Sequence, residues 1–346
     1  MLPTIVHHPA QVDLDKPGKH DYRLAFHLDS GWGYSLVPLT VINGLRPLTA
    51  GVEPPGLAAF GGTHGNEWEG QVAVKRLCQQ LDPNEISGRV ILMPQLSQSA
   101  CAANQRTSPL DNVNMNRAFP GNPCGTISYR IADFVKSHIF PKVRIVVDVH
   151  AGGREGGFAL CTSFHPVADA AQSAEITQVA SLFDTPFMLI YSSQMASGLL
   201  SDQAEAEGKI AIGGEFGFGE GVNRKGVLHA YEGTRNVLKH YGMLLGEIAK
   251  IDPTRAGAPR LVDARNLEDY VPCPYAGIWE PLADLGEEVN EAQLIGRLHD
   301  FSKLSADPLE IHAHCTGVMI MMCGTAQCRQ GTTLYVIARD AVPNNA

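Results

Sequence analysis

The chain has 346 residues, of which 44% are hydrophobic, and it carries a formal net charge of −9. This length allows one large domain and a smaller one, and the hydrophobic fraction can fill an ordinary globular core. The negative charge, without any cluster of lysines and arginines, argues against a nucleic-acid partner, because phosphate neutralisation needs a basic face.

The sequence also argues against association with a membrane and against secretion of the protein. No apolar run approaches the roughly 20 residues that cross a bilayer. Residues 1–9 have no basic stretch followed by an apolar one, so no secretory signal is predicted. The eight cysteines contain no Cys-x-x-Cys pair, which argues against a disulfide framework or a structural zinc cluster. We therefore expect a cytoplasmic protein, and the sequence leaves the oligomeric state open, a homo-oligomer included.

The first part of the chain is predicted to form a helix-flanked sheet. Residues 22–42 look extended and predict an edge hairpin. From residue 57 to 245, short apolar runs alternate with longer segments of helical periodicity, which is typical of a mostly parallel sheet with helices on its faces. The predicted strands are 57–60, 89–93, 144–149, 158–161, 187–191 and 210–212, and the predicted helices lie near 67–81, 126–140, 167–183, 198–207 and 231–249.

After Gly246 the character of the sequence changes. Residues 252–259 contain two prolines and a glycine and read as a linker. Short strand-like runs separated by turns follow at 273–279, 284–289, 317–322 and 332–338. The prediction is an α/β fold in two parts, a catalytic domain over residues 1–252 with an N-terminal extended segment, and a smaller all-β domain over residues 257–346.

Two histidines and a glutamate stand where the predicted strands end. His64 and Glu67 lie on the turn from an apolar strand into a helix, and His150 closes another apolar strand. Two histidines and one carboxylate suit a catalytic zinc, because three protein ligands leave the fourth tetrahedral position open for water. Ligands in open α/β sheets gather at the carboxyl ends of strands. The sequence therefore predicts a metallohydrolase with one Zn²⁺ per chain on His64, Glu67 and His150.

A polar loop follows the second predicted strand and contains Arg106, Asn116 and Arg117. A guanidinium can hold a substrate carboxylate through two parallel hydrogen bonds, and an asparagine amide can add a further donor. These residues predict binding of an anionic substrate. A plain turn is the alternative, since asparagine-rich loops that end in Pro-Gly are usually only turns.

Glu215 follows a third apolar strand and stands among glycines. A carboxylate near an activated water can take its proton and later hand it to a leaving amine, so Glu215 is the predicted general acid/base. The alternative is a solvated loop residue or a helix cap. Arg154, Arg224 and Lys225 are close to these loops in sequence, and we rank them below Arg117 as substrate contacts because exposed loop charges are usually solvated.

Five motifs in this order resemble the succinylglutamate desuccinylase/aspartoacylase family, which belongs to the zinc carboxypeptidase clan. They are Gly-Gly-Thr-His-Gly-Asn-Glu at 61–67, Asn-Met-Asn-Arg-Ala-Phe-Pro-Gly at 114–121, Asp-Val-His at 148–150, Gly-Glu-Phe-Gly at 214–217 and Gly-Thr-Arg-Asn-Val-Leu at 233–238 followed by Gly242. The resemblance covers nearly the whole chain and implies a zinc-carboxypeptidase-like mixed sheet with a β-rich C-terminal domain. It implies zinc on His64, Glu67 and His150, substrate contacts from Arg106, Asn116 and Arg117, and catalysis by Glu215.

The resemblance further implies a hydrolase that removes an acyl group from the nitrogen of a small N-acyl amino acid. Two alternatives remain open at this point. One is a zinc carboxypeptidase-type peptidase, or another ester or amide hydrolase, which would need a more open groove than a deacylase. The other is a catalytically silent binding protein, because a fold does not determine a function. The sequence does not name the acyl group or the amino acid.

Overall fold

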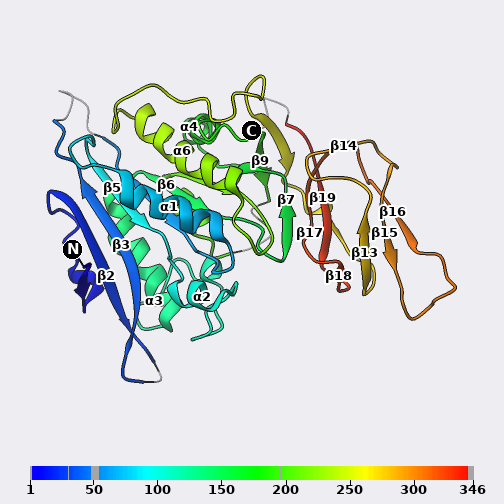
Figure 1. The fold of residues 1–346 in the computed structure, drawn as a ribbon, viewed down its shortest axis with the longest axis horizontal. Coiled ribbons are helices and arrows are strands. Elements are labelled where there is room, and N and C mark those ends of the chain that lie inside the picture. The colour runs from blue at the N-terminus through cyan, green and yellow to red at the C-terminus, as the bar shows by residue number, and fades with distance from the viewer. Residues whose placement is uncertain (1, 30, 48–53, 193, 195–196, 342–346) are drawn as a thin grey trace.

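The computed structural model describes residues 2–29, 31–47, 54–192, 194 and 197–341. Helices pack around the sheet of the N-terminal part, and the C-terminal strands lie at the opposite end of the molecule (Figure 1). The α-helices are α1 (Trp68–Gln80), α2 (Gln98–Ala103), α3 (Ile127–Phe134), α4 (Ala170–Ser181), α5 (Leu200–Ala206) and α6 (Arg224–His240).

One large mixed sheet and one small antiparallel sheet contain the strands. The large sheet consists of β1 (Thr4–Val6), β2 (Gly18–His27), β3 (Tyr34–Asn43), β4 (Leu57–Gly61), β5 (Arg89–Met93), β6 (Ile145–Val149), β7 (Gly156–Phe158), β8 (Cys161–Phe164), β9 (Phe187–Tyr191), β10 (Ile210–Glu215), β11 (Arg260–Ala264), β12 (Tyr270–Pro272), β14 (Glu288–Val289), β17 (Gly317–Cys323) and β19 (Thr333–Asp340). The small sheet consists of β13 (Gly277–Pro281), β15 (Leu294–His299), β16 (Leu309–His312) and β18 (Gln327–Cys328). The predicted α/β class with a β-rich C-terminal part is confirmed.

The centre of the large sheet runs in the order β5-β4-β6-β10-β8-β9. Strands β5, β4, β6 and β10 are parallel neighbours, whereas β8 is antiparallel to β10. One core cluster packs α1, α4 and α6 against one face of the sheet, and a second packs α3 against the other face together with the β2–β3 hairpin. Both faces are covered, which explains why the central strands read as continuous apolar runs.

Several predicted elements were wrong in their bounds. The runs predicted at 273–279 and 284–289 form strands only at β13 and β14. The segment 158–161 is not one strand, because β7 ends at Phe158 and pairs with β17, whereas β8 begins at Cys161 and pairs with β10 and β9. The helix predicted at 231–249 is α6, which begins at Arg224 and ends at His240. Its start is set by Asn223, whose side chain accepts a hydrogen bond from the Gly226 backbone N–H, and after its end Gly242 adopts a φ of +67°.

The C-terminal strands extend the large sheet. Strand β11 pairs in parallel with β9 and antiparallel with β19. The C-terminal strands therefore continue the large sheet directly beyond its central strands. The division into residues 1–252 and 257–346 stays a prediction.

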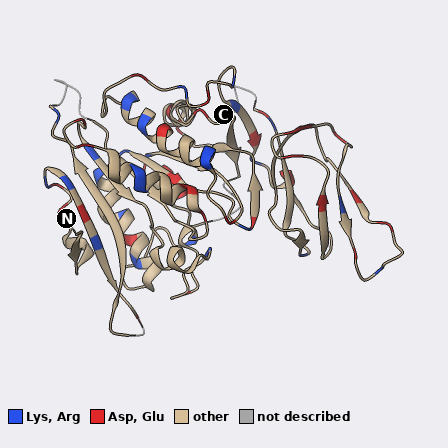
Figure 2. Cartoon of the chain, viewed as in Figure 1, with Lys and Arg blue, Asp and Glu red and all other residues tan. Residues whose placement is uncertain are grey.

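Lysines and arginines are distributed over several helices and strands (Figure 2). Within the described residues, no helix has the length and apolar character needed to cross a membrane.

Close packing of α1 against β6 generates a stability prediction. A Cβ atom added at Gly70 would lie 2.5 Å from the Val149 carbonyl oxygen, which is backbone and cannot rotate away. Alanine normally stabilises a helix relative to glycine by about 0.5–1 kcal/mol, but overpacking costs about 1–3 kcal/mol. We therefore expect Gly70→Ala to lower the free energy of unfolding, measured by urea denaturation. Gln79→Ala, at an exposed position of the same helix, should change it by less than about 0.5 kcal/mol. A Gly70→Ala protein as stable as the parent would contradict this packing.

Candidate active site

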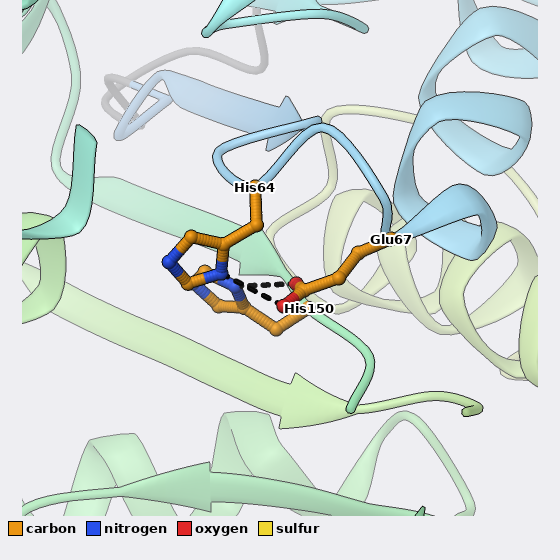
Figure 3. A group of neighbouring side chains, drawn as sticks. All are labelled: His64, Glu67 and His150. Carbon is orange, nitrogen blue, oxygen red and sulfur yellow. Dashed lines mark hydrogen bonds and ion pairs between the residues drawn. The ribbon is translucent and has the colours of Figure 1, made fainter. Parts of the chain in front are cut away.

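The three predicted metal ligands lie together at the carboxyl ends of β4 and β6. His64 is on the turn after β4, Glu67 directly precedes α1, and His150 directly follows β6 (Figure 3). The Glu67 carboxylate lies between the two rings, with Oε1 2.8 Å from His64 Nδ1 and Oε2 2.9 Å from His150 Nδ1. Their ligand atoms all lie within 4.8 Å of one another, and Glu67 is 3% exposed. This group could hold a metal ion.

Glycines allow the turn that carries His64 and Glu67 to lie against its neighbours. A Cβ atom at Gly65 would lie 2.0 Å from the backbone of Ala100 in α2, and Gly62 adopts a φ of +65°. A side chain at either position would push the turn outward or strain it. Gly62 and Gly65 thus allow the close approach of the turn to α2.

The outer nitrogens of both histidines face side-chain oxygens. His64 Nε2 lies 3.0 Å from Asn114 Oδ1, and His150 Nε2 lies 2.8 Å from Asp148 Oδ2. The other oxygen of Asp148 accepts a hydrogen bond from Thr63 Oγ1. Such partners fix the ring orientation and favour a proton on Nε2, which leaves Nδ1 for a metal.

The charges of the group suit a cation at its centre. Burial lowers the pKa of His150, but Asp148 and Glu67 raise it more, so the pKa lies well above its usual value without a metal. Asp148 and Glu67 therefore favour a positive charge at His150. Metal binding to such sites displaces protons from the ligands. The donor set of two imidazole nitrogens and one carboxylate fits zinc.

Glu215 ends β10, beside the end of β6, and its backbone forms a bridge with His150. Its Oε2 atom is buried and has no hydrogen-bond partner in the described part of the chain. Burial and the neighbouring Glu67 carboxylate raise the pKa of Glu215 to about 8, and a bound cation would act in the opposite direction. A buried carboxyl group without a fixed partner is suited to accept and release a proton.

The predicted substrate residues reach the same site but differ in their contacts. Arg106 donates from NH1 to Glu67 Oε1 at 3.0 Å, so it lies against the metal group. Asn116 accepts a hydrogen bond from the Leu200 backbone N–H through Oδ1, and its Nδ2 lies 3.4 Å from His150 Nε2. Arg117 donates to the Asn116 carbonyl oxygen and forms no ion pair with any described residue. The loop therefore brings all three side chains to the cavity, and their role in substrate binding stays a prediction.

A cavity of about 360 Å³ contains all seven predicted site residues. Tyr270, Ile320, Met321 and Val336 contribute to its wall, so the C-terminal strands close one side of it. The remaining wall is formed by Asp148, Ala151, Gly152, Glu155, Gly156, Phe158, Ser163, Leu189, Tyr191, Leu199, Ser201 and Gly213.

Sequence reasoning missed several of these residues. Asp148 could have been found as an orienting residue, because positions two apart on a strand share a face. Asn114 belongs to the same polar loop as Asn116, but its contact with His64 joins positions 50 residues apart, and Tyr270 reaches the cavity from the C-terminal strands. Arg224 and Lys225 begin α6 and do not line the cavity, in contrast to their suggested role.

A second group of histidine and carboxylates lies behind the cavity wall. His165 Nδ1 is 2.9 Å from Glu205 Oε2 and 3.2 Å from Asp202 Oδ1. None of the three lines the cavity, but the His165 ring packs 3.9 Å from the ring of Tyr191, centroid to centroid, and Tyr191 does line it. The buried group therefore supports the wall from behind.

Fold and site together define an α/β protein with a buried His-Glu-His group at the carboxyl ends of adjacent parallel strands. The chain belongs to the succinylglutamate desuccinylase/aspartoacylase family, whose catalytic domain matches residues 54–241, more than half of its length. The resemblance seen in the sequence motifs is confirmed.

Relatives match almost the full length of the chain. It is 32% identical over 332 residues to N-alpha-acetyl-L-2,4-diaminobutyric acid deacetylase of Halomonas elongata, covering 95% of this chain and 94% of that protein. The structure is similar to a succinylglutamate desuccinylase/aspartoacylase from Rhodobacter sphaeroides, with a TM-score of 0.89 and 31% identity over 96% of this chain and 98% of the other. The structure is also similar to the product-bound ectoine utilization protein EutE (DoeB) of Ruegeria pomeroyi, with a TM-score of 0.84 and 28% identity. This similarity covers 95% of this chain and 98% of the other.

The contact between Asp148 and His150 predicts an effect on metal affinity. Replacing Asp148 by asparagine removes the charge that orients His150, and loss of such an outer partner costs about 10–100-fold in metal affinity. We expect Asp148→Asn to lose metal at lower chelator concentrations than the parent, measured by metal analysis after dialysis. His150→Ala, which removes a ligand, provides the reference for complete loss. Equal metal retention by Asp148→Asn and the parent would contradict the orienting role.

Proposed function

We propose that this protein is a zinc-dependent hydrolase that removes an acyl group from the nitrogen of a small N-acyl amino acid. The single observation that carries the proposal is the unpartnered, buried Glu215 carboxyl beside the His64–Glu67–His150 group. Both lie in one cavity of a chain that is 32% identical to a deacetylase of an N-acetyl amino acid. Retention of a proton-transfer group next to a complete ligand set argues against a silent binding protein.

One zinc ion per chain would be held by His64, Glu67 and His150. When bound, zinc supplies a Lewis acid for the acyl carbonyl and lowers the pKa of water in the site. Asn114 and Asp148 keep the two imidazole rings oriented through their outer nitrogens. The protein thus holds the ligands in place before the metal arrives.

Glu215 is the proposed general acid/base. Its carboxylate takes a proton from the attacking water as the bond between oxygen and the acyl carbon forms. It then delivers this proton to the departing amine nitrogen as the carbon–nitrogen bond breaks, so the group ends in its starting state. Because Oε2 has no hydrogen bond to a described residue, no interaction has to be broken first.

The polar loop supplies charge and orientation. Arg106, held at the metal group by Glu67, is the proposed donor to the oxyanion that develops on the acyl oxygen, since fixed charges aimed at this atom are commonly the largest catalytic contribution. Arg117 is free to bind the substrate α-carboxylate through two parallel hydrogen bonds. Asn116 would contact the substrate through Nδ2, because its Oδ1 is already used by Leu200.

The C-terminal strands favour a small substrate over a peptide. Ile320, Met321 and Val336 line a cavity of about 360 Å³, and a peptidase would need room for a chain on both sides of the cleaved bond. The relative from Halomonas elongata is named for an N-acetyl diaminobutyrate substrate. N-acetyl-2,4-diaminobutyrate is therefore the first compound to test, with N-acetyl and N-succinyl forms of other amino acids beside it.

Glu215→Gln tests the role of the carboxyl group. The amide has nearly the same shape but cannot cycle a proton, and general acid/base groups contribute about 10²–10⁴-fold to the rate. We expect kcat to fall by about this factor while metal content stays equal to the parent. Glu207→Gln, at an exposed position at the end of α5, should retain full activity. Turnover by Glu215→Gln within a few-fold of the parent would show that another group moves the proton.

Metal removal tests the cofactor. We expect amine release from N-acyl amino acids to stop after chelation and dialysis, and to return when zinc is added back in a one-to-one ratio to the chain. The measurement is release of free amine with metal content determined in parallel. Full activity in protein proven to be metal-free would overturn the zinc-dependent mechanism.

A further inference from the structure

The charges that line the cavity point to the kind of amino acid in the substrate. We infer that Glu155 binds an ammonium group on the side chain of the substrate, so that the preferred substrates are N-acyl derivatives of amino acids with a short cationic side chain. This inference rests on the proposed deacylase function and adds a specificity-determining residue to it.

Four carboxylates line the cavity, and three of them already have a task. Glu67 lies between His64 and His150. Asp148 contacts His150 with one oxygen and Thr63 with the other. Glu215 is the buried proton-transfer group. The fourth, Glu155, is exposed and forms no hydrogen bond or ion pair with the candidate metal ligands in the described part of the chain, so its charge is available to a ligand.

The position of Glu155 is held by its surroundings. Asn66, the residue before Glu67, donates a hydrogen bond from Nδ2 to Glu155 Oε2 at 3.1 Å. Gly153 lies against both, with a φ of +55°, and a Cβ atom there would be 2.9 Å from Asn66 Nδ2 and 3.1 Å from Glu155 Oε2. The Gly324 backbone N–H donates to the Glu155 carbonyl oxygen. The carboxylate is thus fixed through one oxygen to a residue adjacent to the metal group.

No described cation neutralises Glu155. Arg154, its neighbour in sequence, forms an ion pair with Glu220 instead. Arg106 pairs with Glu67. The second oxygen of Glu155, Oε1, forms no hydrogen bond within the described residues. An accessible carboxylate that is held in place without a cation partner is a site for a positive group on a ligand.

The charges around the cavity therefore complement a substrate with one carboxylate and one ammonium. Arg117 is the guanidinium that forms no ion pair with a described residue, and Glu155 is the matching carboxylate. The side chain of an N-acyl aspartate or glutamate would bring a second negative charge toward Glu155, and like charges at close range reduce affinity.

The test compares three substrates on zinc-loaded parent and Glu155→Gln proteins. They are N-acetyl-2,4-diaminobutyrate, its neutral analogue N-acetyl-2-aminobutyrate, and N-acetyl-aspartate. We expect the parent to prefer the diaminobutyrate compound. Glu155→Gln should raise KM for this compound about tenfold or more, because a hydrogen bond between two charged groups is lost. Its kcat, and both constants for the neutral analogue, should stay within about twofold, which a general structural defect would not produce.

Two further variants sharpen the result. Glu155→Lys reverses the charge and should weaken use of N-acetyl-2,4-diaminobutyrate further while improving use of N-acetyl-aspartate. Glu207→Gln removes an exposed carboxylate that does not line the cavity and should leave the substrate preference unchanged. Equal KM changes for the charged and neutral substrates in Glu155→Gln, or a parent preference for N-acetyl-aspartate, would overturn the inference while leaving the deacylase function intact.

Failure of the proposed function would look different. If zinc is bound but no compound is hydrolysed, calorimetric binding of N-acetyl-2,4-diaminobutyrate to parent and Glu155→Gln proteins still decides the role of Glu155. Binding to the parent that weakens about tenfold in Glu155→Gln would support it, and equal binding or no binding to both would overturn it.

Discussion

The site depends on one buried carboxylate. Glu67 lies between two histidines that come from the ends of neighbouring strands, and its negative charge is stable in the interior only because positive or hydrogen-bonding groups surround it. His64, His150, Arg106 and the Ala151 backbone N–H all contact this carboxylate. The parallel pairing of β4 with β6 brings these groups to the same edge of the sheet. Everything proposed for catalysis starts from this arrangement.

Close backbone packing makes the arrangement precise. The turn before Glu67 touches α2, and α1 lies on β6 with only a hydrogen atom at Gly70 between them. Side chains in protein interiors are packed as tightly as in crystals, so the ligands cannot drift apart without disturbing the core on both faces of the sheet. The candidate metal ligands therefore keep their distances, whereas Arg117 and Glu155, the proposed substrate contacts, lie outside the helices and strands that hold this group.

The C-terminal strands connect chemistry with selectivity. Strand β11 joins the large sheet beside β9, and through β19 and β17 it brings apolar residues to the wall of the cavity. The candidate metal group lies at strand ends of the first part of the chain, and the wall of the cavity comes partly from the last part.

The sequence alone determined the local chemistry of this protein. The apolar runs 57–60 and 144–149, the glycines after them and the types of His64, Glu67, His150 and Glu215 predicted strand ends that carry metal ligands and a proton-transfer group, because these signals are encoded within a few residues of each other. Only the tertiary structure decided which distant residues meet. The division of segment 158–161 between two strands, the contact of Asn114 with His64 and the unpaired charge of Glu155 all depend on partners far away in the chain. Such pairings follow from the packing of the whole molecule, and no local pattern records them.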